Sequence, residues 1–184
     1  MKRIFFLFLT MTAVLFAGQC RYEAKQLEVE WKAYKSPLKI GVGGTFDKVA
    51  IEATDKSSEK SYLETSTVTI STASIDSKNS GRDAKLVKYF FAVQNVKEIK
   101  AKVVSVERKL IKVDITMNGV TKTIPMELDF DDDEIEAEGH IDLADFNMLP
   151  SLTSITKACY DLHKGKTWQD VEIKFELKTR KYCD

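Results

Sequence analysis

Residues 113–130 read VDITMNGVTKTIPMELDF, two alternating runs joined by Asn118-Gly119. Apolar side chains fall on every second residue over 113–117 and again over 124–130. This period of two is typical of a β-strand with one buried face. Asn-Gly between two such runs is the strongest short-range signal for a hairpin. The stretch therefore predicts two antiparallel strands that share an apolar face.

The same alternation recurs on both sides of this hairpin. It predicts about eight strands, over residues 27–33, 40–42, 68–70, 99–103, 113–117, 124–130, 135–143 and 171–177. Two stretches, 82–91 and 152–162, instead space their apolar residues as a helix does; in the second these are Leu152, Ile155, Cys159 and Leu162. Closing eight antiparallel strands into a barrel removes their exposed edges. The expected fold class is all-β: an eight-stranded antiparallel barrel with two short helical insertions.

The first residues are interpreted as an export signal. Lys2 and Arg3 precede an apolar run over 4–17 that ends in small residues, which is the layout of a secretory signal peptide. The run is shorter than the roughly 20 residues that a membrane-spanning helix needs, so we expect cleavage near residues 17–19 and no permanent membrane anchor. The chain then divides into a signal peptide, 1–19, and one domain, 20–184, located in the periplasm or secreted.

Export would make disulfides available to the three cysteines. Cys20 and Cys183 lie at opposite ends of the mature chain, and they would meet if the first and last strands pair antiparallel. Cys159 is expected to be a buried, small apolar residue. Lipidation of Cys20 is an alternative, although Gln19 before it is larger than a lipoprotein signal prefers. Both the pairing and the lipidation stay open.

Composition excludes several functions. Basic and acidic residues number 28 each, so no excess positive charge is available for a nucleic-acid partner. With 43% hydrophobic and 30% charged residues, the chain has globular composition. An outer-membrane barrel would also alternate, but the short, irregular strands and the polar end at 178–184 fit it poorly.

Little in the sequence suggests catalysis, a cofactor or a metal. His140 and His163 belong to no Cys or His cluster, and no metal site is expected. The acidic run within 129–134 lacks the spacing of a calcium loop and is interpreted as a solvated hairpin tip. Asp83 is interpreted as a helix cap and Arg82 as its locally paired neighbour. With His140, these two would be the residues of a barrel enzyme.

Three motifs in order carry a family resemblance. They are SIDSKNSGRD at 74–83, Tyr89-Phe90-Phe91, and NGVTK at 118–122. With the order of the strands around them, they resemble the YceI-like family over most of residues 27–178. The resemblance implies an exported protein with a lipocalin-like barrel of eight strands, which holds a polyisoprenoid or fatty-acyl chain and carries no catalytic residue.

Two features depart from the usual pattern of that family. Gly43-Gly44-Thr45-Phe46 replaces a simpler glycine-phenylalanine step, and residues 149–168 are an insertion. We interpret the glycines from Gly41 to Gly44 as strand glycines that allow a bulge or bend. Both departures leave the identity of the ligand open.

On this resemblance, a ligand would contact apolar side chains of the strands and of the segments beside them. The candidate ligand-binding residues are Val42, Phe46, Val68, Ile70, Phe90, Phe91, Ile99, Val103, Ile115, Met117, Met126, Leu128, Ile141, Phe146, Met148, Leu149 and Phe175. Without the resemblance, the same side chains would be expected to fill the interior.

The leading interpretation is an exported, non-enzymatic protein that sequesters or carries an amphiphilic lipid, with that ligand in place of a cofactor. Two alternatives stay open. One is a barrel enzyme that acts on a lipid-like substrate, and the other is a secreted interaction or effector protein with a solid core. A homodimer also stays open.

Overall fold

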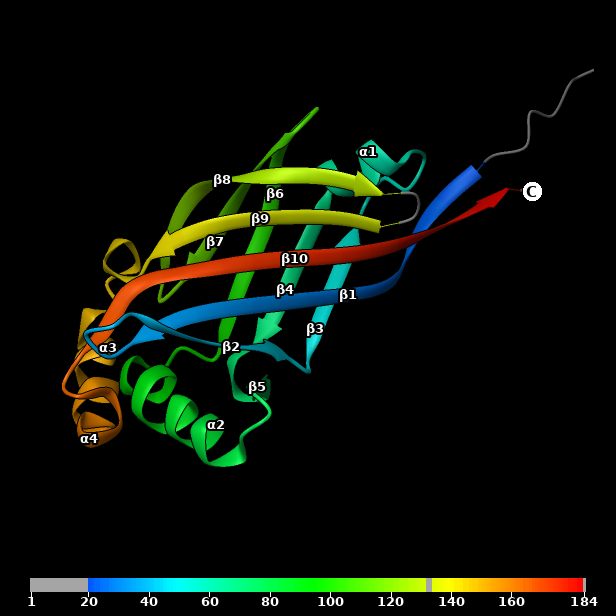
Figure 1. The fold of residues 1–184 in the computed structure, drawn as a ribbon. Helices are drawn as coiled ribbons and strands as arrows, with labels where there is room; N and C mark the ends of the chain where they lie inside the picture. The colour runs from blue at the N-terminus through cyan, green and yellow to red at the C-terminus, as the bar shows by residue number, and fades with distance from the viewer. Residues whose placement is uncertain (1–19, 132–133, 184) are drawn as a thin grey trace, which may run out of the picture.

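The structure is a computed structural model that describes residues 20–131 and 134–183 (Figure 1). The expected signal peptide, 1–19, and part of the acidic run, 132–133, lie outside the described residues. Ten strands form one antiparallel sheet, which curls strongly into a half-barrel. The strands are β1 (Cys20–Lys35), β2 (Ile40–Phe46), β3 (Val49–Ala53), β4 (Ser66–Ser71), β5 (Ile75–Asp76), β6 (Glu98–Glu107), β7 (Leu110–Met117), β8 (Val120–Asp131), β9 (Glu134–Asp142) and β10 (Thr167–Cys183).

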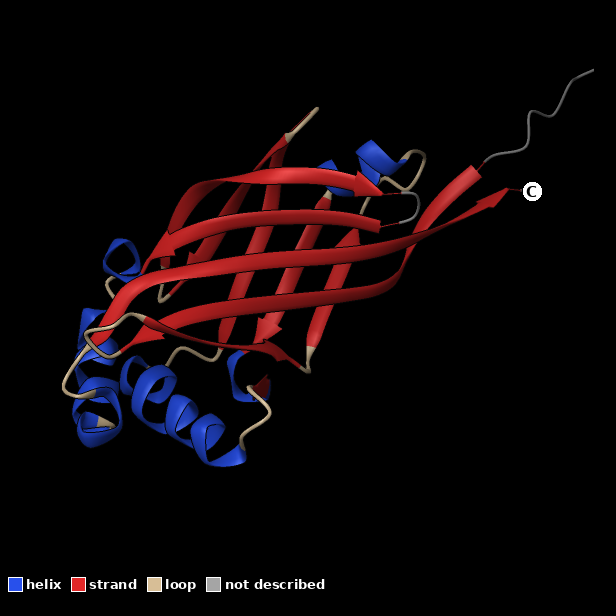
Figure 2. Ribbon diagram, in the orientation of Figure 1, coloured by secondary structure: helices blue, strands red, loops and turns tan. Residues whose placement is uncertain are grey.

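Short helices gather at the two ends of the sheet (Figure 2). They are α1 (Glu59–Glu64), η1 (Thr72–Ser74), α2 (Ser80–Leu86), η2 (Val87–Phe91), η3 (Ala92–Gln94), η4 (Leu143–Phe146), α3 (Leu149–Ala158) and α4 (Tyr160–His163). The helices α2, α3 and α4 lie together at one end, and α1 lies at the other (Figure 1). The two predicted helical stretches are therefore confirmed as α2–η2 and α3–α4, while α1 was not predicted.

The sheet contains two strands more than predicted. Its order is β3-β4-β6-β7-β8-β9-β10-β1-β2-β5, so the two unpredicted strands, β3 and β5, are its two edges. In the part of the chain that the structure describes, these edges do not pair with each other, which makes the sheet a half-barrel rather than the closed eight-stranded barrel expected. Two residues of β5 are too few to show alternation, and a break at Asp47-Lys48 isolates the five residues of β3.

The hairpin predicted at Asn118-Gly119 is confirmed. Strands β7 and β8 pair from Leu110↔Glu127 to Met117↔Val120. Asn118 and Gly119 form the turn, with φ angles of 52° and 73°. Two consecutive positive φ angles are what a type I′ turn requires, and Asn and Gly adopt them at little cost.

The first and last strands of the chain are neighbours. β1 and β10 pair antiparallel from Cys20↔Cys183 to Lys35↔Thr167. A disulfide joins Cys20 to Cys183, as expected if these ends met. The sulfur that lipidation of Cys20 would modify is therefore already bonded, so lipidation and this disulfide are mutually exclusive.

Gly44 lets β2 approach β5 closely. A Cβ atom at this position would overlap the carbonyl oxygen of Asp76 and lie 2.8 Å from the Cα of Ser77. Because both obstacles are backbone atoms, Gly44→Ala should displace β5 and lower the free energy of unfolding by about 1–3 kcal/mol. Urea denaturation measures this difference. Gly41→Ala is the matched control, because its Cβ would meet the flexible side chain of Lys32 at 3.0 Å; equal stability of the two variants would contradict the argument.

Candidate ligand-binding site

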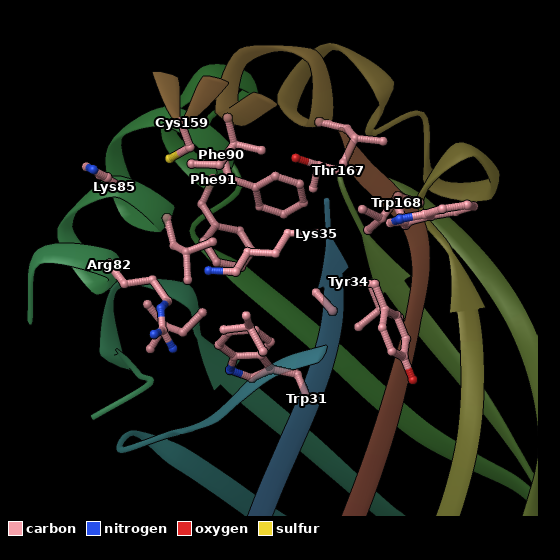
Figure 3. Close-up of a pocket in the computed structure, with 18 of the residues that line it drawn as sticks. Trp31, Tyr34, Lys35, Arg82, Lys85, Phe90, Phe91, Cys159, Thr167 and Trp168 are labelled. Carbon is pink, nitrogen blue, oxygen red and sulfur yellow. The ribbon is translucent and has the colours of Figure 1, made fainter. Parts of the chain in front are cut away.

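A cavity lies between the concave face of the sheet and the helices at one end (Figure 3). Its volume is about 490 Å³, and sites for small molecules span about 300–1,000 Å³. The wall is mostly apolar and comes from β1, β2, β5, β6, β7, β9, β10, η4 and the helices α2, η2, α3 and α4. The aromatic lining residues are Trp31, Tyr34, Phe46, Phe90, Phe91 and Trp168.

The loop before α2 fixes one wall of the cavity. The side-chain oxygen of Asn79 accepts a hydrogen bond from the backbone N–H of Arg82 at 2.9 Å, so Asn79 caps this helix. Asp83, expected to be the cap, instead accepts hydrogen bonds from the backbone N–H of Ser77, at 2.9 Å, and from its hydroxyl. Asn79 is better placed because it precedes the first turn. Arg82, expected to pair locally, makes no ion pair with any described residue, and it lines the cavity.

The second helical insertion lines the cavity beside the first. Leu152, Ile155, Cys159 and Leu162, the face predicted from helical spacing, all line the cavity. Cys159 is buried, as expected, and takes no part in the disulfide. Ser151 is fully buried and donates a hydrogen bond from its hydroxyl to the side-chain oxygen of Gln94 at 2.8 Å, which attaches α3 to η3.

The structure brings together part of the predicted set of ligand-binding residues. The candidates that line the cavity are Val42, Phe46, Phe90, Phe91, Ile99, Met117 and Ile141. Ile99 lies where β6 begins, and Met117 and Ile141 lie where β7 and β9 end, all at the helix-covered end of the sheet. Val42 and Phe46 lie near the two ends of β2, and Phe90 and Phe91 belong to η2. Their contact with a ligand stays a prediction.

The remaining candidates lie outside the cavity wall. They are Val68, Ile70, Val103, Ile115, Met126, Leu128, Phe146, Met148, Leu149 and Phe175. Most are packed in the hydrophobic core, where side chains from facing parts of the curled sheet fill the space, while Leu149 is 44% exposed. Alternation identifies the inward face of a strand. It does not tell which residues of that face pack in the core and which line the cavity.

Sequence reasoning missed much of the remaining wall. Trp31 lies on the predicted inward face of its strand, so the alternation could have identified it. No such signal exists for Lys35, Arg82 and Lys85, which also line the cavity. A basic residue in an alternating or helical pattern is ordinarily expected on a solvated face.

The cavity wall of the described chain contains no aspartate or glutamate. Its basic residues are Lys35, Arg82, Lys85 and His163, each partly buried. The Nδ1 atom of His163 lies 2.9 Å from the hydroxyl oxygen of Thr167. Burial, and then the positive charges of Lys35 and Lys85, lower the pKa of His163 below its ordinary value.

A second polar feature of the wall is an unpaired donor. The indole Nε1 of Trp31 is buried and has no hydrogen-bond partner among the residues that the structure describes. An unpaired buried donor is costly for a folded protein. Because Trp31 lines the cavity, this unpaired donor belongs to a side chain of the cavity wall.

The acidic side chains that come closest together lie elsewhere, on β9 and β10. Ligand atoms of Glu134, Glu136 and Glu176 lie within 4.8 Å of one another. Lys174 contacts Glu136 at 2.8 Å and Lys178 contacts Glu134 at 3.5 Å. A hydrogen bond between Glu134 and Glu176 raises the pKa of Glu134. The lysines that contact these carboxylates are the feature of an ion-pair network, and they do not fit a dedicated metal site.

The residues of the enzyme alternative are not assembled. His140 is exposed on β9, opposite Glu172 of β10, and does not line the cavity. Asp83 is engaged with Ser77. Of the three residues, only Arg82 reaches the cavity.

The helices of the described chain are all short. None of them has the length and apolar character needed to cross a membrane.

The curled antiparallel sheet and the mostly apolar cavity beside it place the protein in the class of β half-barrel domains with an internal cavity. Residues 21–179 match the YceI-like domain. The chain belongs to the YceI-like family. No protein with a curated description matches it.

Solved structures share this fold at low sequence identity. A domain from Saccharophagus degradans, described as polyisoprenoid binding and implicated in plant cell wall breakdown, is 14% identical with a TM-score of 0.62, over 89% of this chain and 98% of that chain. Burkholderia cenocepacia BcnA is 17% identical with a TM-score of 0.56, over 84% and 96%. A YceI protein of Campylobacter jejuni is 18% identical with a TM-score of 0.52, over 78% and 85%. At these identities, the likeness establishes the fold alone.

Proposed function

We propose that this protein is a non-enzymatic binder that sequesters or carries an amphiphile, with the apolar chain of the ligand in the cavity under the helices. One observation carries the proposal: a space of about 490 Å³ with a mostly apolar wall is left unfilled inside a folded domain. The description of the Saccharophagus degradans domain as polyisoprenoid binding supports an isoprenoid or acyl chain as the ligand.

The energetics favour a long apolar chain. Each buried methylene contributes about 0.8 kcal/mol, so several methylenes can offset the cost of ordering a flexible ligand. Side chains from both helical insertions, such as Leu86 and Leu152, cover the cavity opposite the sheet. A chain bound there would be shielded from water on both sides.

Two further observations support this proposal over the alternatives. A secreted interaction protein with a solid core would not need the cavity. Of the residues that a barrel enzyme could use, Asp83, Arg82 or His140, only Arg82 lines it. The disulfide between Cys20 and Cys183 supports an oxidising compartment, hence a periplasmic or secreted location.

The proposal is tested by mass spectrometry of an organic extract of the native protein, together with titration of isoprenoids and fatty acids into ligand-free protein. An isoprenoid or acyl compound in stoichiometric amount is expected, and it should remain chemically unchanged after prolonged incubation. A protein that contains no such compound and binds neither class would refute the proposal.

Filling the cavity should block binding. Leu152→Trp adds bulk from α3 to the space that the ligand would occupy, and we expect at least roughly tenfold weaker binding, equivalent to about 1.4 kcal/mol. Fluorescence titration measures the change. Leu38→Trp is the control, since Leu38 is 79% exposed and does not line the cavity. Met126 is unsuitable for this test, because it is 1% exposed in the packed core and a larger side chain there would strain the fold.

A further inference from the structure

We propose that the cavity selects amphiphiles with an anionic head group, a carboxylate or a phosphate, which Lys35, Arg82 and Lys85 hold at the helical wall. This inference rests on the proposed function and specifies the class of ligand. Three features of the cavity support it: the charges of its lining residues, the positions of the three cations, and a hydrogen-bond donor without a partner in the same wall of the described chain.

The wall carries positive charge with no compensating carboxylate. The charged side chains that line the cavity are those of lysine and arginine, together with His163, and no aspartate or glutamate belongs to the lining of the described chain. The protein as a whole has equal numbers of basic and acidic residues, 28 each. The excess at the cavity is therefore local and does not reflect a basic protein.

Two lysines near Lys35 in sequence form ion pairs, whereas Lys35 forms none with a described residue. Lys32 contacts Glu172 at 2.9 Å, and Lys39 contacts Asp170 at 2.7 Å. Lys35 lies between these two in sequence, yet it makes no ion pair within the described residues and lines the cavity instead. The two carboxylates of β10 pair with Lys32 on β1 and with Lys39 in the turn after it, and neither carboxylate lines the cavity.

The three cations come from two separate elements. Lys35 ends β1, and its side chain extends across the cavity toward the helical wall (Figure 3). Arg82 and Lys85 lie one turn apart on α2, and neither makes an ion pair with a described residue. A group that binds between β1 and α2 would meet positive charge from both sides.

The lowered pKa of His163 is consistent with a positively charged cavity wall. After burial, the largest influences that lower its pKa are Lys35 and Lys85. The positive charges of Lys35 and Lys85 therefore act on a side chain of the cavity wall. Partial burial strengthens such interactions, because the surroundings screen charge less than water does.

Trp31 adds a neutral donor to this group. Its buried Nε1–H has no partner in the described chain, and an oxygen of the head group would satisfy it. An arginine guanidinium binds carboxylate and phosphate oxygens through paired hydrogen bonds. An alcohol offers a single uncharged oxygen, so it would gain much less from the same residues.

The test compares ligands that share a chain and differ in charge. The pairs are palmitate with hexadecanol and geranylgeranyl diphosphate with geranylgeraniol, titrated into ligand-free protein at low ionic strength. We expect at least one anion to bind about 10- to 100-fold more tightly than its alcohol. The pair with the larger ratio tells whether the site prefers a carboxylate or a phosphate. Equal affinities within both pairs would overturn this inference and leave the proposed function intact, whereas no binding of any of the four compounds would refute both.

Variants connect the preference to the named residues. Lys35→Gln combined with Arg82→Gln should lower the affinity for the anion by a much larger factor than the affinity for the alcohol, and so remove most of the preference. Lys88→Gln combined with Lys97→Gln removes the same charge from exposed positions outside the cavity and should retain the preference. Retained alcohol binding shows that the double variant is folded. A preference that survives in that variant contradicts the assignment.

The two histidines provide an independent readout. A bound anion would offset the charges of Lys35 and Lys85, so the pKa of His163, followed by NMR, should rise on binding palmitate and not on binding hexadecanol. His140 is exposed on β9 outside the cavity and serves as the internal reference. A tightly bound anion that leaves the pKa of His163 unchanged would place the head group elsewhere and contradict the inference.

Discussion

Replacing Cys20 and Cys183 by serine is expected to lower the free energy of unfolding by about 2–5 kcal/mol. The disulfide joins residues that are 163 positions apart in sequence. A crosslink that closes so long a loop removes many conformations from the unfolded chain, which stabilises the folded state. Guanidinium denaturation of the oxidised protein and of the double variant measures the difference.

Reduction provides the control for this comparison. A thiol reductant should destabilise the native protein to the level of the double serine variant and should not change the variant itself. Cys159, the third cysteine, is buried and outside the disulfide, so it does not contribute to the difference. Equal stability of the oxidised protein and the variant would contradict the expected role of the crosslink.

Phe146→Ala is expected to cost about 3–5 kcal/mol of unfolding free energy. The Phe146 side chain is 0% exposed and belongs to the core around η4. Its truncation removes a buried ring and leaves a void that the surrounding strands can fill only in part. Leu149→Ala, three residues further along, removes a side chain that is 44% exposed and should change stability by less than about 0.5 kcal/mol.

Binding assays add a second readout to this pair. Neither side chain lines the cavity, although the sequence predicts both as ligand contacts. Each variant, compared under conditions in which it is folded, should therefore bind the ligand nearly as the parent protein does. Similar stabilities of the two variants would contradict the packing seen in the structure.

The alternation of apolar residues was sufficient for most of the sheet. Every predicted strand is present, and the turn at Asn118-Gly119 has the backbone conformation that its residues favour. The edges were missed, because β5 is two residues long and is placed by its pairing with β2. The resulting half-barrel depends on tertiary contacts that no local pattern encodes.

The candidate site was less predictable than the fold. Met117 lines the cavity and Ile115, two residues earlier on the same face, is buried in the core. Their pattern in the sequence is the same, and only their distance from the helical end separates them. The basic residues of the wall are equally hard to predict. Lys35 is in phase with Trp31 and Ala33 on the inward face, but a lysine at the end of a strand is ordinarily expected in solvent.

The pairing of β1 with β10 has a consequence for the order of events in biosynthesis. The first strand, β1, can pair with its longest neighbour, β10, only after residues 167–183 have been synthesised. Contacts between such distant segments form slowly, since the intervening chain has to be brought together first. A nascent chain that lacks residues 167–183, which form β10, cannot complete the sheet, so we expect folding to finish only after β10 has left the ribosome.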